Sequence, residues 1–312
     1  MAYRPAEQII HKAAWLYYTH GLRQDEVAQR LNISRASVAL YLRKAREAGI
    51  VNISTSTHLF SGERLARQVE DAFGLETVWL VGEDALSPSP ASEIPTLAAN
   101  VFLEMVENGN QVCVAWGRTV YDIADAMSYA DREGVTVVEM CGNLGSPYAY
   151  RPDQCTMEIA RRLNAKGLNF YAPLVLSTEE LARALREEPV IREQLDGISA
   201  CDMALFTVGA LDADSHVIKC GALSLEELER LKTMGATGVI AGQIITADGT
   251  LLDCDYNRRM ISADFDAIRA IPRRLMVVQE DEKFEPLQAA IAGRFFTHLV
   301  TTSSMATKLL KH

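Results

Sequence analysis

A short segment near residue 117 carries the residue types that bind polar small molecules. After the apolar run QVCVAW come Gly117, Arg118 and Thr119, at the predicted start of a helix. Backbone N–H groups at a helix start, a glycine that allows close approach, a cation and a hydroxyl together suit a phosphate group or a sugar hydroxyl. The segment therefore predicts a ligand-binding loop that follows a strand.

Residues of this kind also follow other apolar runs. Gly142 and Asn143 come after VTVVEMC, Gln243 comes after GVIAG, and Lys283 comes after RRLMVVQ and three acids. A single glycine after a strand is more often required by a turn, and a single lysine usually lies at the surface. Their shared position after strands is what favours one binding site. The predicted ligand-binding set is Gly117, Arg118, Thr119, Gly142, Asn143, Gln243 and Lys283.

No catalytic constellation accompanies these residues in the sequence. The six histidines lack metal-ligand spacing, and the chain has neither a G-x-S-x-G motif nor a P-loop. Asp253 and Asp255 are paired carboxylates, but alternate residues of a strand point to opposite faces. We therefore expect no catalytic residue, no metal site and no cofactor.

The body of the chain predicts an α/β domain that positions the ligand-binding set. Short β-rich runs alternate with helical stretches, and the runs are nearly continuous in apolar character. Such runs are typical of strands buried on both faces, as in a parallel sheet covered by helices. We expect an open, doubly wound, mostly parallel sheet with ligands at the carboxyl ends of its strands. The expected strands are TVWLVG, QVCVAWG, VTVVEMCG, LNFYAPLVL, MALFTVGA, GVIAGQIIT, RRLMVVQE and THLVTT.

The first fifty residues predict three helices. The first, Ala6–His20, has an apolar stripe of helical spacing and ends at Gly21, and RQDEVAQRL is a short second helix. Ser34 is a good N-cap for a third helix that runs to about Ala48. Asn32 occupies the tight turn before it, where the backbone must be left-handed. Two short helices joined by a tight turn, the second one basic, predict an all-α helix-turn-helix domain.

Charge separates the same two parts of the chain. The formal net charge is −10, yet residues 1–60 hold eight basic and four acidic side chains, so this head carries +4 and the remainder −14. A basic head on an acidic body fits contact of the head alone with a polyanion. A basic helix is usually only a solvated face. Here, however, the helix lengths, the turn and the exposed basic residues coincide and favour double-stranded DNA as a partner.

The predicted DNA contacts lie on the third helix. The start of such a helix reaches base edges in the major groove, and its later basic residues reach phosphates. We expect a DNA-binding domain at residues 1–55 and a ligand-binding domain at residues 56–312, with a linking helix at 62–73. The predicted DNA-binding set is Arg35, Ala36, Ser37, Ala39, Arg43 and Arg46.

Composition restricts the class of protein. The 312 residues are 48% hydrophobic and 23% charged, which is ordinary for globular proteins and sufficient for two domains. No apolar run approaches the roughly 18 residues that span a membrane, and the N-terminus lacks an apolar core followed by a cleavage site. None of the six cysteines forms a C-x-x-C pair, so we expect reduced, buried thiols, with metal ligation or a catalytic thiol as the alternative. These features predict a cytoplasmic protein without membrane contact.

Taken together, these segments resemble the SorC family of bacterial transcriptional regulators. The head AAWLYYTHGLRQDEVAQRLNISRASVALYLRKAREAGIV is similar to the family's DNA-binding segment, and VAWGRT, APLVL, MALFTVGAL, GVIAGQIITADGTLLD and LQAAIAGRFFTHLVTTSSMATKLL follow its effector domain in order. The resemblance implies a regulator of carbohydrate or polyol catabolism genes that binds a sugar, a polyol or a sugar phosphate and forms dimers or tetramers. It also implies that Gly117, Arg118 and Thr119 form the effector loop and that Lys283 holds a phosphate of the effector.

The chain departs from the family pattern at three places. Gln243 stands where an aspartate is frequent, VVQEDEK replaces a glycine-rich segment before the lysine, and TTSS replaces TD. The acids Glu280, Asp281 and Glu282 would repel a phosphate, which leaves room for a neutral polyol or an unusual sugar. The resemblance also implies an effector domain related to sugar-phosphate isomerases and deaminases, so an enzyme with a DNA-binding head is the alternative. The lack of a convincing acid–base pair favours the regulator.

Overall fold

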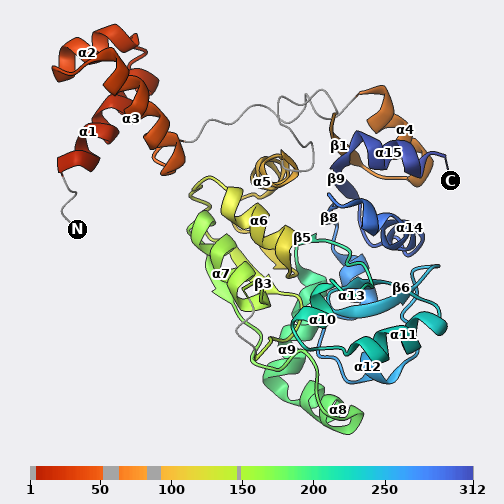
Figure 1. Cartoon of the computed structure of the whole chain (residues 1–312). Coiled ribbons are helices and arrows are strands. Elements are labelled where there is room, and N and C mark those ends of the chain that lie inside the picture. The colour runs from red at the N-terminus through yellow and green to blue at the C-terminus, as the bar shows by residue number, and fades with distance from the viewer. Residues whose placement is uncertain (1–4, 52–62, 83–92, 146–148, 312) are drawn as a thin grey trace. The chain divides into compact units, whose positions relative to one another are not determined.

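The computed structural model describes residues 5–51, 63–82, 93–145 and 149–311 (Figure 1). The chain divides into two compact units, residues 1–55 and 56–312, and each has hydrophobic cores of its own. Residue 62, the expected start of the linking helix, lies outside the described residues. The helix observed there is α4 (Arg64–Phe73).

The N-terminal unit is a small packet of helices. Asn32 ends α2 in the left-handed conformation, with φ 54° and ψ 49°, as its turn position predicts. Ser34 caps α3, because its Oγ accepts a 3.0 Å hydrogen bond from the backbone N–H of Ser37. Both caps lie where the sequence predicts them. The elements are α1 (Pro5–Ala14), the π-helical turn η1 (Trp15–Thr19), α2 (Gln24–Leu31) and α3 (Arg35–Glu47).

Apolar residues of all four elements, α1, η1, α2 and α3, form the core of this unit. Val27 and Ala28 of α2 face Val38, Leu42 and Ala45 of α3, and all five are buried. Both α1 and α2 pack against α3. The remaining face of α3 is therefore left to solvent, and that face carries the basic residues.

The C-terminal unit is built on a seven-stranded sheet. The strand order is β1-β9-β8-β5-β2-β3-β4, and every neighbouring pair is parallel. This pairing confirms the predicted α/β fold with a mostly parallel sheet. The strands are β1 (Thr77–Val81), β2 (Gln111–Val114), β3 (Thr136–Glu139), β4 (Lys166–Leu168), β5 (Met203–Phe206), β8 (Arg273–Val277) and β9 (His298–Thr302).

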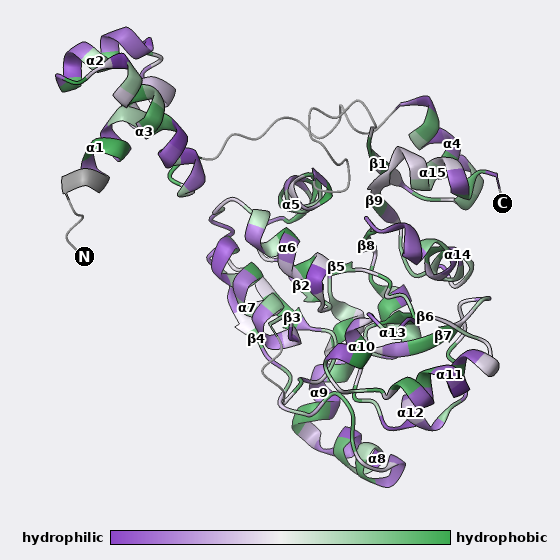
Figure 2. Ribbon diagram, in the orientation of Figure 1, coloured by the Kyte–Doolittle hydropathy of each residue, from purple (hydrophilic) through white to green (hydrophobic). Residues whose placement is uncertain are grey.

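Helices bury both faces of this sheet. In β2, Val112 and Val114 belong to one hydrophobic core and Cys113 to a second core. Alternate residues of a strand point to opposite faces, so the sheet lies between the two cores, as the continuous apolar runs predict. Figure 2 shows both hydrophobic and hydrophilic residues along covering helices such as α7 and α11, as expected when one side of a helix faces a core. The helices of the unit besides α4 are α5 (Ile94–Met105), α6 (Arg118–Ala126), α7 (Pro152–Leu163), α8 (Glu179–Glu187), α9 (Pro189–Gly197), α10 (His216–Lys219), α11 (Leu225–Thr233), α12 (Asp255–Arg258), α13 (Phe265–Ala270), α14 (Phe284–Ala292) and α15 (Ser303–Leu309).

The prediction that LNFYAPLVL forms one strand is wrong, because only its first residue, Leu168, lies in a strand. Only β4, Lys166–Leu168, pairs with β3, and the chain after it is irregular. Pro173 lies within this stretch and lacks the N–H that a ladder needs, and Tyr171 is largely exposed. Phe170, Ala172 and Leu174 of the run are buried by the packing of this irregular segment, whereas Leu168 is exposed.

The expected strand GVIAGQIIT folds as an antiparallel hairpin outside the main sheet. Its two strands are β6 (Ala236–Ile240) and β7 (Gln243–Thr246). The chain reverses at Ala241 and Gly242, which have φ of 50° and 84°. Each strand contributes residues to both hydrophobic cores of the unit. That two-sided burial explains why the run resembled a central parallel strand.

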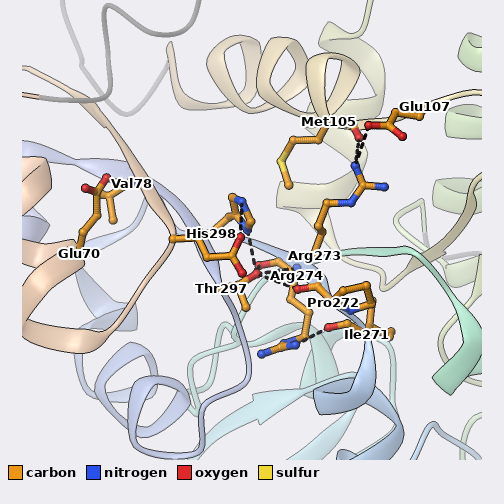
Figure 3. A network of polar contacts seen from close by, with 11 residues as sticks. Glu70, Val78, Met105, Glu107, Ile271, Pro272, Arg273, Arg274, Thr297 and His298 are labelled. Carbon is orange, nitrogen blue, oxygen red and sulfur yellow. Dashed lines mark hydrogen bonds and ion pairs between the residues drawn. The ribbon is translucent and has the colours of Figure 1, made fainter.

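Two arginines occupy the amino-terminal end of β8 (Figure 3). The Nε of Arg274 donates to the backbone oxygen of Phe295 at 2.9 Å, and its Nη1 donates to that of Arg269 at 2.9 Å. Arg273 donates from Nη2 to the Oδ1 of Asn110, also at 2.9 Å. This edge of the sheet is thus held by contacts within the protein, whereas ligands of open α/β sheets bind at the opposite, carboxyl edge.

Candidate functional site

A cavity lies at the carboxyl edge of the sheet, where the strand order reverses. From β2 the chain continues to β3 and β4 on one side, while β5, β8 and β9 extend on the other side. Such a switch point is where open α/β sheets bind ligands. The cavity has a volume of about 580 Å³ and is lined by residues that follow β2, β5 and β8. This volume falls within the range of small-molecule pockets, roughly 300–1,000 Å³.

The loop after β2 forms one wall of the cavity. Gly117 has φ 111°, a backbone conformation that favours glycine, and its N–H donates to the backbone oxygen of Tyr150 at 3.2 Å. Helix α6 begins at the next residue, Arg118, so the N–H groups of its first turn have no partner within the helix. The buried hydroxyl of Thr119 lies in the same turn. This arrangement provides donors and a hydroxyl at the cavity, as the sequence predicts.

Lys283 connects the ends of three strands. It lies in the short 3-10 helix η5 (Asp281–Lys283) after β8 and is 9% exposed. Its Nζ donates to the Oγ1 atoms of Thr119, after β2, and Thr207, after β5, at 3.2 Å each. Burial lowers the pKa of Lys283, and the carboxylate of Glu280 opposes that effect. The structure therefore brings Gly117, Thr119 and Lys283 together around one cavity.

Glu280 lies between the two cations of the cavity. Its Oε1 accepts a 2.7 Å hydrogen bond from the Nη2 of Arg118, and its Oε2 lies 2.9 Å from the Nζ of Lys283. Burial alone would raise the pKa of Glu280, but the charge and hydrogen bond of Lys283, together with Arg118, lower it to about 2. The carboxylate is thus ionised at neutral pH and neutralises part of the charge of both partners.

The cavity as a whole is weakly acidic. Burial, followed by the charges of Lys283 and Arg118, lowers the pKa of His216 to about 4, so this imidazole is neutral at pH 7. The charged residues that line the cavity are three basic ones and four acidic ones, which gives a formal charge of −1. They are Arg118, Lys219 and Lys283, and Asp212, Asp214, Glu280 and Glu282.

Neutral polar and aromatic groups complete the lining. Ser215 is 8% exposed, and its Oγ has no hydrogen-bond partner within the part of the chain that the structure describes. The rings of Tyr150 and His216 meet edge to face, with centroids 5.8 Å apart. Trp116 also lines the cavity. A ligand with several hydroxyls and an apolar face would find partners for both.

In the N-terminal unit, the predicted DNA-binding residues lie on the solvent side of α3. Arg35, Ala36, Ala39, Arg43 and Arg46 are exposed. Ser37 is half-buried and bonds to its N-cap, Ser34. Arg35 is also 3.4 Å from Asp25 of α2, and both side chains are more than half exposed. This surface presents basic groups without burying them.

Comparison with known proteins identifies the family of this chain. Residues 58–311 match the family model described as "Putative sugar-binding domain". A protein of Escherichia coli (strain K12) with the name "Uncharacterized transcriptional regulator YjhU" is 30% identical over 310 residues, which are 97% of this chain and 94% of that protein. The crystal structure of the full-length sorbitol operon regulator SorC from Klebsiella pneumoniae has a TM-score of 0.72 and 22% identity, and covers 98% of this chain and 100% of that one. The chain belongs to the SorC family of bacterial transcriptional regulators.

The resemblance drawn from the sequence is therefore confirmed. A further relative, the deoxyribonucleoside regulator of Bacillus subtilis (strain 168), is 26% identical over 313 residues, 98% of each chain. The region that matches the sugar-binding domain of the SorC family contains every residue that lines the cavity.

Three residues of the predicted ligand-binding set do not line this cavity. The Nε2 of Gln243 donates to the Oγ of Ser262 and to the backbone oxygen of Ala263, at 3.2 and 2.9 Å. Asn143 donates from Nδ2 to Glu139 at 3.1 Å. A Cβ at Gly142 would come within 2.5 Å of a backbone oxygen, so close packing accounts for this glycine. Their role in ligand binding stays a prediction.

Other residues line the cavity that were not in the predicted ligand-binding set. Thr207 follows β5 directly, so a hydroxyl at a strand end was present in the sequence as a signal for this residue. Ser215 and His216 lie in a connection that carries no strand-end signal. Glu280 was noted only as a group that repels anions, because Arg118, one of its two cationic partners, is 162 residues away in sequence.

The structure also bears on metal sites, membrane spans and disulfides, for the residues that it describes. Among them, no group of three or more His, Cys, Asp or Glu side chains is arranged to hold a metal ion. No described helix combines the length and the apolar character needed to cross a membrane. The six cysteines are buried and free of disulfides, in agreement with the expected reduced thiols.

Proposed function

We propose that this SorC-family protein is a transcriptional regulator of carbohydrate or polyol catabolism genes, and that a sugar, a polyol or a sugar phosphate changes its affinity for DNA. The observation that carries the proposal is the cavity in which Lys283 joins the ends of β2, β5 and β8 within the sugar-binding region. Its hydroxyl, cationic and aromatic lining suits a small polyhydroxy compound. On this proposal, residues 56–312 are the effector domain.

Residues 1–55 are, on the same proposal, a helix-turn-helix DNA-binding domain. The short helix α2, the left-handed turn at Asn32 and the capped helix α3 support this assignment. The exposed residues at the start of α3, Arg35 and Ala36, would face base edges. The later residues Arg43 and Arg46 would face phosphates. Ser37 and Ala39 complete the proposed contact set.

The active form would be a homo-oligomer, a dimer or a tetramer. One helix-turn-helix head makes few base contacts, so affinity comes from two heads on a two-fold site. Helix α4 and the acidic effector domain are the surfaces available for association. Mass measurement in solution at micromolar concentration, with and without DNA, is expected to exclude a strict monomer. We also propose that the protein acts in the cytoplasm, where its DNA target is found.

An enzyme of the sugar-phosphate isomerase or deaminase type is the competing function. Such chemistry needs a general base with a pKa near the working pH. The pKa of Glu280, the carboxylate between the two cations of the cavity, is about 2, which makes it a weak base at neutral pH. The relatives, moreover, carry the names of regulators. Turnover of a sugar phosphate by the purified protein would support the enzyme.

One experiment tests the regulatory function directly. The protein is used to select binding sites from a pool of randomised duplex DNA, and a library of sugars, polyols and their phosphates is screened for compounds that raise its melting temperature. We expect an enriched site with two-fold symmetry, and at least one stabilising compound that changes affinity for that site. Absence of an enriched site, or ligands that bind without any effect on DNA affinity, would contradict the proposal.

A further inference from the structure

The position of Glu280 bears on the chemistry of the ligand. Its Oε1 lies 2.7 Å from the guanidinium of Arg118, and its Oε2 lies 2.9 Å from the ammonium of Lys283. Each carboxylate oxygen thus forms an ion pair with one cation. An incoming phosphate would use these same two cations through its own oxygens. The carboxylate therefore occupies the anion-binding position of the cavity with a group of the protein itself.

The charge of the cavity opposes a phosphate dianion in a second way. The lining residues carry a formal charge of −1, with Glu282 and Asp212 adding to Glu280. Displacement of Glu280 by a phosphate would leave this carboxylate without its cations while two further negative charges entered. Coulomb repulsion between like charges is strong at a partly buried site, where water screens it less than in bulk solvent.

Protonation does not remove this obstacle under ordinary conditions. Burial favours the neutral acid, but the neighbouring Lys283 and Arg118 hold the pKa of Glu280 at about 2. The carboxylate consequently keeps its charge throughout the pH range in which a regulator works.

We propose that Glu280 is a specificity-determining residue that excludes phosphorylated compounds and selects an uncharged sugar or polyol as the ligand of this cavity. This inference rests on the proposed function for its biological meaning. An uncharged ligand can bind beside this carboxylate while Glu280 still holds Arg118 and Lys283, because such a ligand brings no second anion to compete for the two cations.

Other groups of the cavity fit an uncharged polyhydroxy ligand. Ser215 lines the cavity, and its buried hydroxyl has no hydrogen-bond partner among the described residues. The edge-to-face pair of Tyr150 and His216 offers an apolar surface for the C–H groups of a sugar. A neutral imidazole at His216 adds no attraction for an anion.

The test is calorimetric titration of the full chain with inorganic phosphate and with three matched pairs of probes. The pairs are D-glucitol and its 6-phosphate, D-fructose and its 6-phosphate, and 2-deoxy-D-ribose and its 5-phosphate. For the wild type we expect the unphosphorylated member of a pair to bind more tightly than its phosphate. In Glu280→Gln, which removes the charge and keeps the size, affinity for inorganic phosphate should rise about tenfold or more.

The matched control is Glu285→Gln. Glu285 is an exposed carboxylate five residues further along that does not line the cavity, so this variant makes the same change of charge and should leave phosphate affinity at the wild-type value. Glu280→Ala is a second variant at the site, and melting curves establish that each variant is folded. The paired titrations of the wild type need no variant, so they decide even if the substitutions unfold the protein.

Two results would overturn the inference. One is a wild type that binds the phosphate of a pair more tightly than the parent compound. The other is a folded Glu280→Gln or Glu280→Ala protein without any gain in phosphate affinity. Failure of the regulatory proposal looks different, because it is seen as a lack of site-specific DNA binding or of its response to ligands. The titrations are done without DNA and remain informative in that event.

Discussion

The two units hold their basic side chains in opposite ways. In the N-terminal unit, Arg35 is 73% exposed and lies 3.4 Å from Asp25, which is 56% exposed. In the C-terminal unit, the side chain of Lys283 is 11% exposed and contacts Glu280 at 2.9 Å as well as two hydroxyls. An exposed ion pair contributes about 0–1 kcal/mol, whereas removal of one partner from a buried pair is strongly destabilising.

This difference indicates which region can exchange an ion-pair partner within the protein for a group of a ligand. The exposed pair of Arg35 can give up Asp25 for a DNA phosphate or base at little cost, because both partners are already hydrated. Breaking an ion pair of the buried cluster around Glu280 costs several kcal/mol, so a ligand has to bind beside Arg118, Glu280 and Lys283 without separating them. The head is thus suited to a polyanion, and the cavity is suited to a ligand that leaves its ion pairs intact.

The largest effect is expected from Lys283→Ala. The substitution removes an ammonium from a buried cluster and leaves Glu280 with Arg118 as its remaining cation. We expect a loss of about 2–3 kcal/mol in the free energy of unfolding, toward the lower end for a broken buried pair because that second cation remains. Urea denaturation at pH 7 measures it.

The control for this prediction is Lys308→Ala. Lys308 forms a 2.9 Å ion pair with Asp281, but both side chains are more than 40% exposed. Its removal should therefore cost at most about 1 kcal/mol. Equal losses for the two lysines would contradict the contrast between a buried cluster and exposed ion pairs.

A second effect is expected on the pH dependence of stability. The pKa of Glu280 is lowered from 4.5 to about 2, so its contribution is fully present above pH 4.5 and is lost as the pH falls toward 2. The contribution is about 3 kcal/mol, and Glu280→Gln should flatten the stability curve in this range. The pKa of His216 is lowered from 6.5 to about 4, so its contribution is present above pH 6.5 and is lost as the pH falls toward 4. This pH window lies above that of Glu280. Denaturation midpoints measured every half unit of pH separate the two windows, and an unchanged curve for Glu280→Gln below pH 4.5 would contradict the ion-pair geometry.

The sequence predicted the local features of both regions better than their long-range contacts. The cap at Ser34 and the left-handed turn at Asn32 depend on residues within a few positions, and both lie where expected. The parallel sheet was also predicted, because two-sided burial produces continuous apolar runs. The hairpin β6–β7 has the same apolar character, however, and its place outside the sheet depends on tertiary packing that periodicity does not encode.

In the candidate site, too, local features were predicted from the sequence and long-range contacts were not. Gly117, Thr119 and Lys283 were predicted together, because the residues after parallel strands meet at one edge. The partnership of Glu280 with Arg118 spans 162 residues and could not be read from spacing. Gln243 follows a short apolar run as the others do, but it follows a hairpin turn and not a strand of the main sheet, so its side chain bonds within the protein.

In the head, Arg35→Ala is expected to reduce specific DNA binding by about 1–3 kcal/mol and to relax base preference. Arg35 is the first residue of α3, where side chains reach base edges, and its exposed ion pair with Asp25 is easily broken. Titrations on the selected site and on a scrambled duplex measure both quantities. Stability of the fold should change little, in contrast with Lys283→Ala. Equal losses on the two duplexes would contradict a base-reading role for Arg35.

The smallest effect is expected from Arg46→Ala, which tests whether the exposed face of α3 contacts the phosphates of DNA. Arg46 lies in the last turn of α3 and is exposed. A phosphate contact there weakens binding to all sequences alike, and its loss reduces the slope of log affinity against log salt by about one unit. The control is Lys166→Ala, which removes one exposed positive charge from the C-terminal unit and should leave the slope unchanged. Titrations at four salt concentrations on both duplexes measure it. A change of slope in Lys166→Ala as large as in Arg46→Ala would mean that net charge, and not the surface of α3, governs contact with DNA, and the contrast between the two units would then fail.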